Sequence, residues 1–345
     1  MTQSAAARGA ALSTTAAPQA PAVPKRAVFA TVLGNWLEFF DFTVYALFAV
    51  TIGRQFFPVE SASGQLLLSL ATFGVGFVMR PLGGIVIGAY ADRVGRKAAL
   101  TLTIMLMALG TAILGLTPSY AEIGLAAPAL IVLARLLQGF SAGGELGAAT
   151  TYLLELAPQG RRGLYASWQY ASQGLATLAA SLMGFGLAEA LTPEAMESWG
   201  WRVPFLFGLL IGPVGLYIRR HMDETAHAGG AHGSAGAVLR TLASRHAGLV
   251  LIGVLTIMGG TISSYIIGKY MTTYALHTLH MPAGTAMLAS VVSGSVIALG
   301  SVLGGWLSDR FGRRALMVLP RALFVVAVYP AFLLITADRR PRRCC

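Results

Sequence analysis

Long apolar runs alternate along this chain with short segments that hold most of its charged residues. A helix needs about 20 apolar residues to cross the hydrocarbon core of a bilayer. Nine runs reach that length: 28–52, 66–90, 98–117, 124–152, 164–190, 201–218, 247–275, 284–307 and 315–336. The pattern therefore predicts an all-α membrane protein with about nine transmembrane helices.

The basic residues between these runs predict an orientation, because cytoplasmic loops carry an excess of Lys and Arg. If residue 25 lies in the cytoplasm and the spans alternate, only Arg54 and Arg202 fall outside. Fourteen basic residues then fall inside: Lys25, Arg26, Arg93, Arg96, Lys97, Arg161, Arg162, Arg219, Arg220, Arg240, Arg245, Arg310, Arg313 and Arg314. We therefore expect a cytoplasmic N-terminus.

The composition supports the membrane class and argues against several others. Hydrophobic residues make up 55% of the 345 and charged residues only 11%, whereas a soluble domain carries about 25% charged residues. The net charge of +11 lies in short clusters between apolar runs, which favours membrane topology over nucleic-acid binding. No metal-ligand spacing, phosphate loop or nucleophile–base pair is present, so we expect no cofactor, no metal and no enzyme activity.

A charged hairpin occurs twice, as GAYADRVGRK at 88–97 and as GWLSDRFGRR at 305–314. The two copies lie 217 positions apart, and the first and seventh spans begin at the same separation (28 + 217 = 245). Parallel repeats of this kind build some transporters. We expect the Gly to allow the turn, the Asp to contact helix ends or bases, and the bases to lie at lipid headgroups. The hairpin residues are Gly88, Asp92, Arg93, Gly95, Arg96, Asp309, Arg310, Gly312 and Arg313.

The repeat divides the chain into parts. We expect a disordered cytoplasmic tail (1–24), a six-helix N-terminal bundle (25–218), a cytoplasmic linker (219–246), a partial C-terminal bundle of three helices (247–336) and an aberrant basic tail (337–345). A full second unit would need about three more spans, at about 30 residues for each span and loop. The tail ADRRPRRCC would also place four Arg outside, so we expect a truncated or frame-shifted C-terminus; a natural nine-span protein is the alternative.

The hairpin sequence resembles the signature of the major facilitator superfamily. The stretches at 34–49, 76–97 and 135–163 resemble the metabolite–proton symporter family, and those at 198–208 and 270–282 are most similar to citrate–proton symporters. The resemblance implies a major facilitator fold with twelve spans in the complete family members. It also implies proton-coupled uptake of a small carboxylate by a monomer in a bacterial inner membrane.

Two carboxylates lie in the middle of the first span, where ionisable groups are costly and usually functional. Glu38 and Asp41 share a helix face, which Tyr45 extends. Because burial favours the uncharged form of a carboxyl group, these residues are candidates for proton coupling. The alternative is that one of them only pairs with a neighbouring Arg.

Several cations and amides lie at a similar depth. Arg80 stands about 18 Å from the inner turn, and Arg135 and Gln138 share a face of the fourth span. The candidate substrate-binding residues are Arg80, Arg135, Gln138, Gln169, Gln173, Lys269 and Tyr45. For Gln169 and Gln173 the alternative is simple contact between helices. For Lys269 the alternative is that its ammonium group extends to the lipid headgroups.

Three buried cations favour an anionic substrate such as a tricarboxylate or dicarboxylate. The aromatic residues of the first span leave open a betaine- or proline-type osmolyte, and a shikimate-like acid is also compatible. A non-transporting membrane fragment is the alternative from another functional class.

Overall fold

The protein is described by a computed structural model, which covers residues 25–220, 244–279 and 281–337. The expected N-terminal tail, most of the expected linker and nearly all of the basic C-terminal tail lie outside these residues. The described parts are helical and contain no strand. The N-terminal helix set comprises α1 (Lys25–Leu47), α2 (Ala49–Phe56), α3 (Ala62–Val94), α4 (Arg96–Leu116), α5 (Tyr120–Ile123), α6 (Ala126–Leu156), α7 (Arg162–Ala190), α8 (Pro193–Ser198), the 3₁₀ turn η1 (Gly200–Arg202) and α9 (Val203–Arg220). The C-terminal helix set comprises α11 (Ala247–Tyr265), the π-helix η2 (Ile266–Tyr270), α12 (Met271–His277), α13 (Ala283–Phe311) and α14 (Arg313–Ala337).

The expected apolar spans appear as helices, and the first of them is bent. Seven helices of the described chain are long and apolar enough to cross a membrane, or eight if α1 and α2 form one broken span. The axes of α1 and α2 differ by 67°, so the expected span 28–52 takes the form of a broken pair of helices. The last predicted span of the N-terminal set, 201–218, is the 18-residue α9, which is about 27 Å long.

The bend after α1 has a physical cause in the amphipathic sequence of α2. One face of α2 buries Ile52, Gly53 and Phe56, whereas Arg54 on the other face is exposed. A Cβ at Gly53 would lie 2.8 Å from the Gln65 carbonyl oxygen, so α2 packs closely on α3. The bend therefore turns the apolar face of α2 inward and leaves its Arg in solvent.

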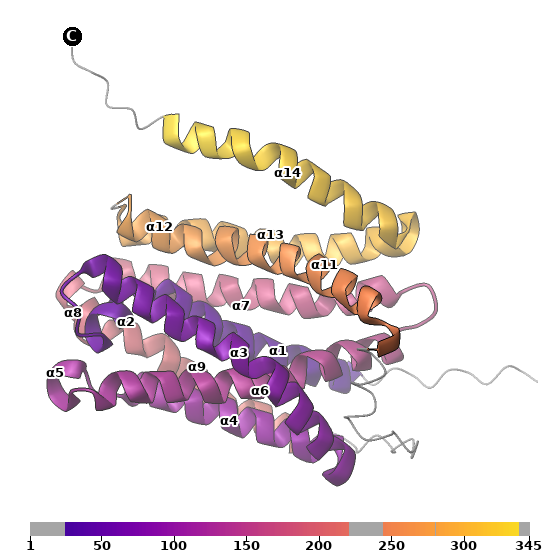
Figure 1. Cartoon of the computed structure of the whole chain (residues 1–345), viewed down its shortest axis with the longest axis horizontal. Coiled ribbons are helices and arrows are strands. Elements are labelled where there is room, and N and C mark those ends of the chain that lie inside the picture. Colours follow the sequence, from indigo (N-terminus) through magenta and orange to yellow (C-terminus); the bar gives the residue numbers. More distant parts are fainter. Residues whose placement is uncertain (1–24, 221–243, 280, 338–345) are drawn as a thin grey trace, which may run out of the picture.

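The long helices lie side by side along one direction, as Figure 1 shows. In this view α14 lies at one edge and α4 at the opposite edge, and α7 is the helix of the N-terminal set that lies beside the C-terminal set. The buried apolar core gathers around α1, where Phe40, Val44 and Phe48 pack with Trp201 and Phe205. The first span is thus the central element of the N-terminal helix set.

Glycines allow the closest helix contacts. A Cβ at Gly139 on α6 would overlap the carbonyl group of Gly76 on α3, and one at Gly143 would overlap the carbonyl group of Arg80. Gly139 and Gly143 lie four residues apart, so both close contacts are on the same face of α6. This crossing fixes the backbones that carry Arg80 and Arg135 close together.

The two repeated hairpins form tight turns, as expected. Gly95 joins α3 to α4 with φ of 110°, and Gly312 joins α13 to α14 with φ of 89°, a region that favours glycine. Asp309 accepts hydrogen bonds from the backbone N–H groups of Gly163 (2.7 Å) and Leu164 (2.9 Å). The C-terminal hairpin therefore caps the first turn of α7, a helix of the N-terminal set.

Candidate functional site

The first span carries a row of polar side chains into the protein interior. Glu38, Asp41 and Tyr45 are 2%, 4% and 0% exposed. Their spacing of three and four residues places them on one face of α1. Because α1 is the most enclosed helix of its set, this face meets other helices rather than lipid.

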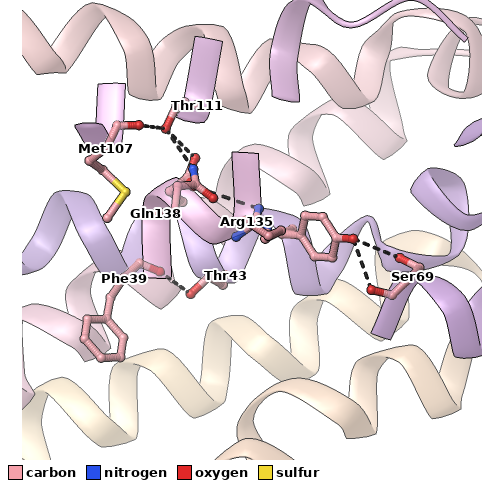
Figure 2. Close-up of polar contacts among 9 residues, drawn as sticks. Phe39, Thr43, Ser69, Met107, Thr111, Arg135 and Gln138 are labelled. Carbon is pink, nitrogen blue, oxygen red and sulfur yellow. Dashed lines mark hydrogen bonds and ion pairs between the residues drawn. The ribbon is translucent and has the colours of Figure 1, made fainter. Parts of the chain in front are cut away.

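Asp41 lies at the centre of a buried hydrogen-bond cluster, and Figure 2 labels its neighbours Thr111, Gln138 and Arg135. The Thr111 hydroxyl on α4 donates to Asp41 Oδ1 at 3.1 Å, and Gln138 Nε2 on α6 donates to Asp41 Oδ2. Arg135 Nη2 stands 4.0 Å from the same Oδ2. Side chains from α4 and α6 thus meet the Asp41 carboxylate on α1. Arg135 attracts this carboxylate electrostatically and forms no hydrogen bond with it.

The Arg135 side chain is fully buried, yet its guanidinium group lacks hydrogen-bond partners. Its exposed fraction is 0%, and none of its three guanidinium nitrogens has a hydrogen-bond partner in the structure. The guanidinium carbon lies 3.8 Å from the centre of the Tyr45 ring, and the Tyr45 hydroxyl donates to the Ser69 carbonyl at 3.1 Å. A buried charge without hydrogen bonds is unfavourable, so this group is suited to receive an anion.

A second ion pair runs beside the first. Arg80 Nη2 on α3 lies 3.5 Å from Glu38 Oε1. The Arg80 guanidinium also faces the rings of Phe42 and Phe77, at 4.8 and 4.5 Å. Arg135 faces the same Phe42 ring at 5.8 Å. Two acids of α1 are therefore matched with two arginines from α3 and α6, with one aromatic ring in contact with both cations.

Lys269 enters this region from the C-terminal helix set. It belongs to the π-helix η2, a geometry that is rare and frequently found at functional sites. Its Nζ donates to the hydroxyl of Thr43 on α1 and to that of Thr177 on α7, the latter at 2.8 Å. It therefore points inward between the helix sets, rather than toward a headgroup.

Of the two predicted glutamines, Gln169 joins α7 to other helices, whereas the hydrogen bond of Gln173 lies within α7. Gln169 is buried, its side-chain oxygen accepts from Thr150, and its backbone carbonyl accepts from Asn35 Nδ2 at 2.9 Å. Gln173 is half-buried, and its backbone carbonyl accepts a hydrogen bond from the Thr177 hydroxyl. Neither is among the hydrogen-bond partners of Asp41 or Lys269.

A small, partly open cavity adjoins the carboxylate cluster. Glu38, Asp41 and Thr111 line it together with Glu145, and its volume is about 30 Å³. That volume holds a water molecule or two and is too small for a tricarboxylate. In this conformation the cavity has room for water and none for an organic acid.

The remaining predicted site residues lie at the hairpins. Arg93, Arg310 and Arg313 are exposed, and Arg310 lies over the Trp306 ring at 5.6 Å. Gly88 lies within α3 and has open space at its Cβ position. The side chains of Asp92 and Arg96 lie outside the part of the chain that the structure describes.

Three threonines that the sequence pattern did not indicate lie at the site in the structure. Thr111 contacts Asp41, and Thr43 and Thr177 contact Lys269. Threonine is common in transmembrane helices, so its position along the chain carries little signal on its own. Only the meeting of α1, α4 and α7 distinguishes these hydroxyls from the others.

Comparison with known proteins decides the family. The family model described as "Major Facilitator Superfamily" matches residues 31–341. The chain belongs to the major facilitator superfamily. It is accordingly a multi-pass membrane transporter with an all-α fold, rather than an enzyme.

Curated relatives fall into more than one substrate group. A citrate-proton symporter of Klebsiella pneumoniae is 41% identical over 88% of this chain and 69% of that protein. A citrate-proton symporter of Salmonella typhi is 39% identical over 93% of this chain and 75% of that protein. A proline/betaine transporter of Escherichia coli is 34% identical over 91% of this chain and 65% of that protein.

Solved structures support the fold. The xylose transporter XylE of E. coli, in a partially occluded inward-open conformation, matches with a TM-score of 0.62 at 19% identity, over 84% of this chain and 74% of that chain. The fucose:proton symporter FucP of E. coli matches with a TM-score of 0.59 at 17% identity, over 86% of this chain and 74% of that chain. At these identities the similarity concerns the fold alone.

Proposed function

We propose that this protein is a secondary transporter that carries citrate, or a related tricarboxylate or dicarboxylate, together with protons. The observation that carries the proposal is the Arg135 guanidinium, which is fully buried without a hydrogen bond on any nitrogen. A substrate carboxylate would give it two parallel charge-assisted hydrogen bonds. The citrate-proton symporters among the relatives support the same substrate class.

The second cation for a multivalent anion is Lys269. It comes from the C-terminal helix set, whereas Arg135 comes from the N-terminal set. Among the described residues, no carboxylate forms an ion pair with Lys269 within 4.0 Å. A substrate held between these two cations would contact both helix sets, which is the arrangement that alternating access requires.

Proton coupling follows from competition for Arg135. Both oxygens of Asp41 accept hydrogen bonds, and the ionised carboxylate attracts Arg135 from 4.0 Å. Protonation of Asp41 removes this attraction and frees the guanidinium for a substrate carboxylate. Glu38 stands in the same relation to Arg80 and is the second candidate for a coupled proton.

The arrangement of the aromatic rings favours an acid over a betaine. A quaternary ammonium ligand needs free aromatic faces. Here Arg80 occupies faces of Phe42 and Phe77, and Arg135 occupies that of Tyr45. An osmolyte or a shikimate-like acid remains the second candidate, because proline/betaine transporters are also similar to this chain.

The repeated hairpins are proposed as conformational gates at the cytoplasmic face. Asp309 caps α7 from the other helix set, so this contact must break when the two sets separate at that end. The excess of basic residues in the same segments supports a cytoplasmic N-terminus. We propose a monomer in a bacterial inner membrane.

Transport in proteoliposomes tests the proposal. With the outside more acidic than the inside, labelled citrate should accumulate, and collapse of the pH gradient should reduce the initial rate at least tenfold. A hundredfold excess of unlabelled glycine betaine should leave that rate unchanged. A citrate uptake rate that does not depend on the pH gradient would reject proton symport, and uptake of betaine in place of citrate would favour the osmolyte candidate.

A further inference from the structure

The contact of Lys269 with two threonines has a feature that simple helix packing does not require. The Thr43 hydroxyl donates to the Phe39 carbonyl at 2.7 Å, and the Thr177 hydroxyl donates to the Gln173 carbonyl at 2.9 Å. A hydroxyl has one hydrogen to donate and two lone pairs that accept. Since each hydrogen is already used, both oxygens face Lys269 Nζ as acceptors.

The two hydroxyl oxygens form one acceptor pair for the ammonium group. They lie 3.5 Å apart and come from different helices, α1 and α7. Thr43 and Thr177 are 0% and 3% exposed, so water does not take their place. The ammonium group of Lys269 thus donates hydrogen bonds to two uncharged oxygens of the N-terminal helix set.

A transporter of this kind completes its cycle by returning without substrate. In that step a buried ammonium has lost the substrate carboxylate and needs other acceptors, because an unsatisfied buried charge is costly. The hydroxyl pair of Thr43 and Thr177 supplies acceptors of this kind.

We propose that Thr43 and Thr177 serve as a substitute ligand for Lys269, and that they allow the empty transporter to pass through its closed state. This inference rests on the proposed anion transport. During net uptake the hydroxyl pair holds the ammonium while the site is empty. During exchange of external for internal substrate the transporter crosses the membrane loaded in both directions, so the pair is not needed.

The double variant Thr43→Val/Thr177→Val removes both acceptors and keeps the side-chain shape. We expect proton-driven net uptake of labelled citrate to fall at least tenfold, while citrate/citrate exchange stays within threefold of the wild type. The apparent Kd for citrate should also decrease, because the substrate no longer competes with the hydroxyls for Lys269. An equal loss of net uptake and exchange, or weaker citrate binding, would overturn the inference.

A matched control and a second variant separate this role from a folding defect. Thr272 is buried on α12 and bonds to Ser290 on α13 within its own helix set, so Thr272→Val should change neither rate by more than twofold. Thr177→Ser restores an acceptor and should recover net uptake relative to Thr177→Val. If it does not, the hydroxyl is not the active feature. If wild-type protein exchanges no citrate at all, the proposed function fails and this inference falls with it; wild-type exchange with unchanged net uptake in the double variant overturns only the inference.

Discussion

The replacement of Arg135 by lysine tests the substrate site most directly. The variant Arg135→Lys keeps a positive charge opposite Asp41 and loses the planar fork that binds a carboxylate through two hydrogen bonds. A hydrogen bond to a charged group contributes about 1.5–3 kcal/mol. Loss of one of two such bonds should raise the Kd for citrate by about 10- to 150-fold, at about 1.4 kcal/mol for each factor of ten.

The measurement is isothermal titration of citrate into purified protein, with uptake by proteoliposomes beside it. Arg135→Ala is less informative, because it leaves Asp41 buried without its positive neighbour, a change that typically costs about 3–5 kcal/mol of stability. Arg54 offers a matched control, since it forms an exposed ion pair with Glu197 away from the cluster. Arg54→Lys should leave the Kd within about twofold of the wild type. If Arg135→Lys also stays within twofold, Arg135 does not hold the substrate, and the mechanism built on it is wrong.

Three further changes probe the proton, the gate and the helix crossing. Asp41→Asn mimics the protonated carboxyl group and keeps an acceptor and the side-chain shape. Uptake by the wild type should fall as the external pH rises, and uptake by the variant should be independent of pH. A variant with the wild-type pH profile would assign Asp41 a structural role. Asp309→Asn weakens the cap on α7 by about 1 kcal/mol. This change should raise the rate at which maleimide labels Ser167→Cys, a buried position on α7, by about fivefold. An unchanged labelling rate would contradict the proposed gate. Gly139→Ala should lower uptake at least tenfold, because the new Cβ overlaps the α3 backbone. Gly74→Ala on α3 meets nothing within 4 Å and should leave uptake unchanged; similar uptake in both variants would show that the close crossing is not needed.

The bend between α1 and α2 shows where the hydrophobic pattern alone was insufficient. Apolar length predicted one span over 28–52, and that length is present. The direction of the chain after Leu47 depends on the contact of α2 with α3, in which Gly53 meets the Gln65 backbone. A contact between segments is not encoded in the apolar length of either segment.

The sequence by itself determined the membrane class, the helices and which ionisable side chains are buried at a cost in free energy. Charges within apolar runs are rare, so Glu38, Asp41, Arg80, Arg135 and Lys269 were identified from their depth alone. The repeated Gly-Asp-Arg hairpins also followed from local turn chemistry, and both glycines adopt the positive φ that this chemistry requires.

Only the tertiary structure decided which of these groups meet. It pairs Asp41 with Arg135 and Glu38 with Arg80, although a sequence allows either combination. It also brings Lys269 to hydroxyls more than 90 positions away, on helices of the other set. Burial of a charge follows from local composition, but the choice of its partner follows from how helices distant in the chain cross, and that is set by packing along their whole length.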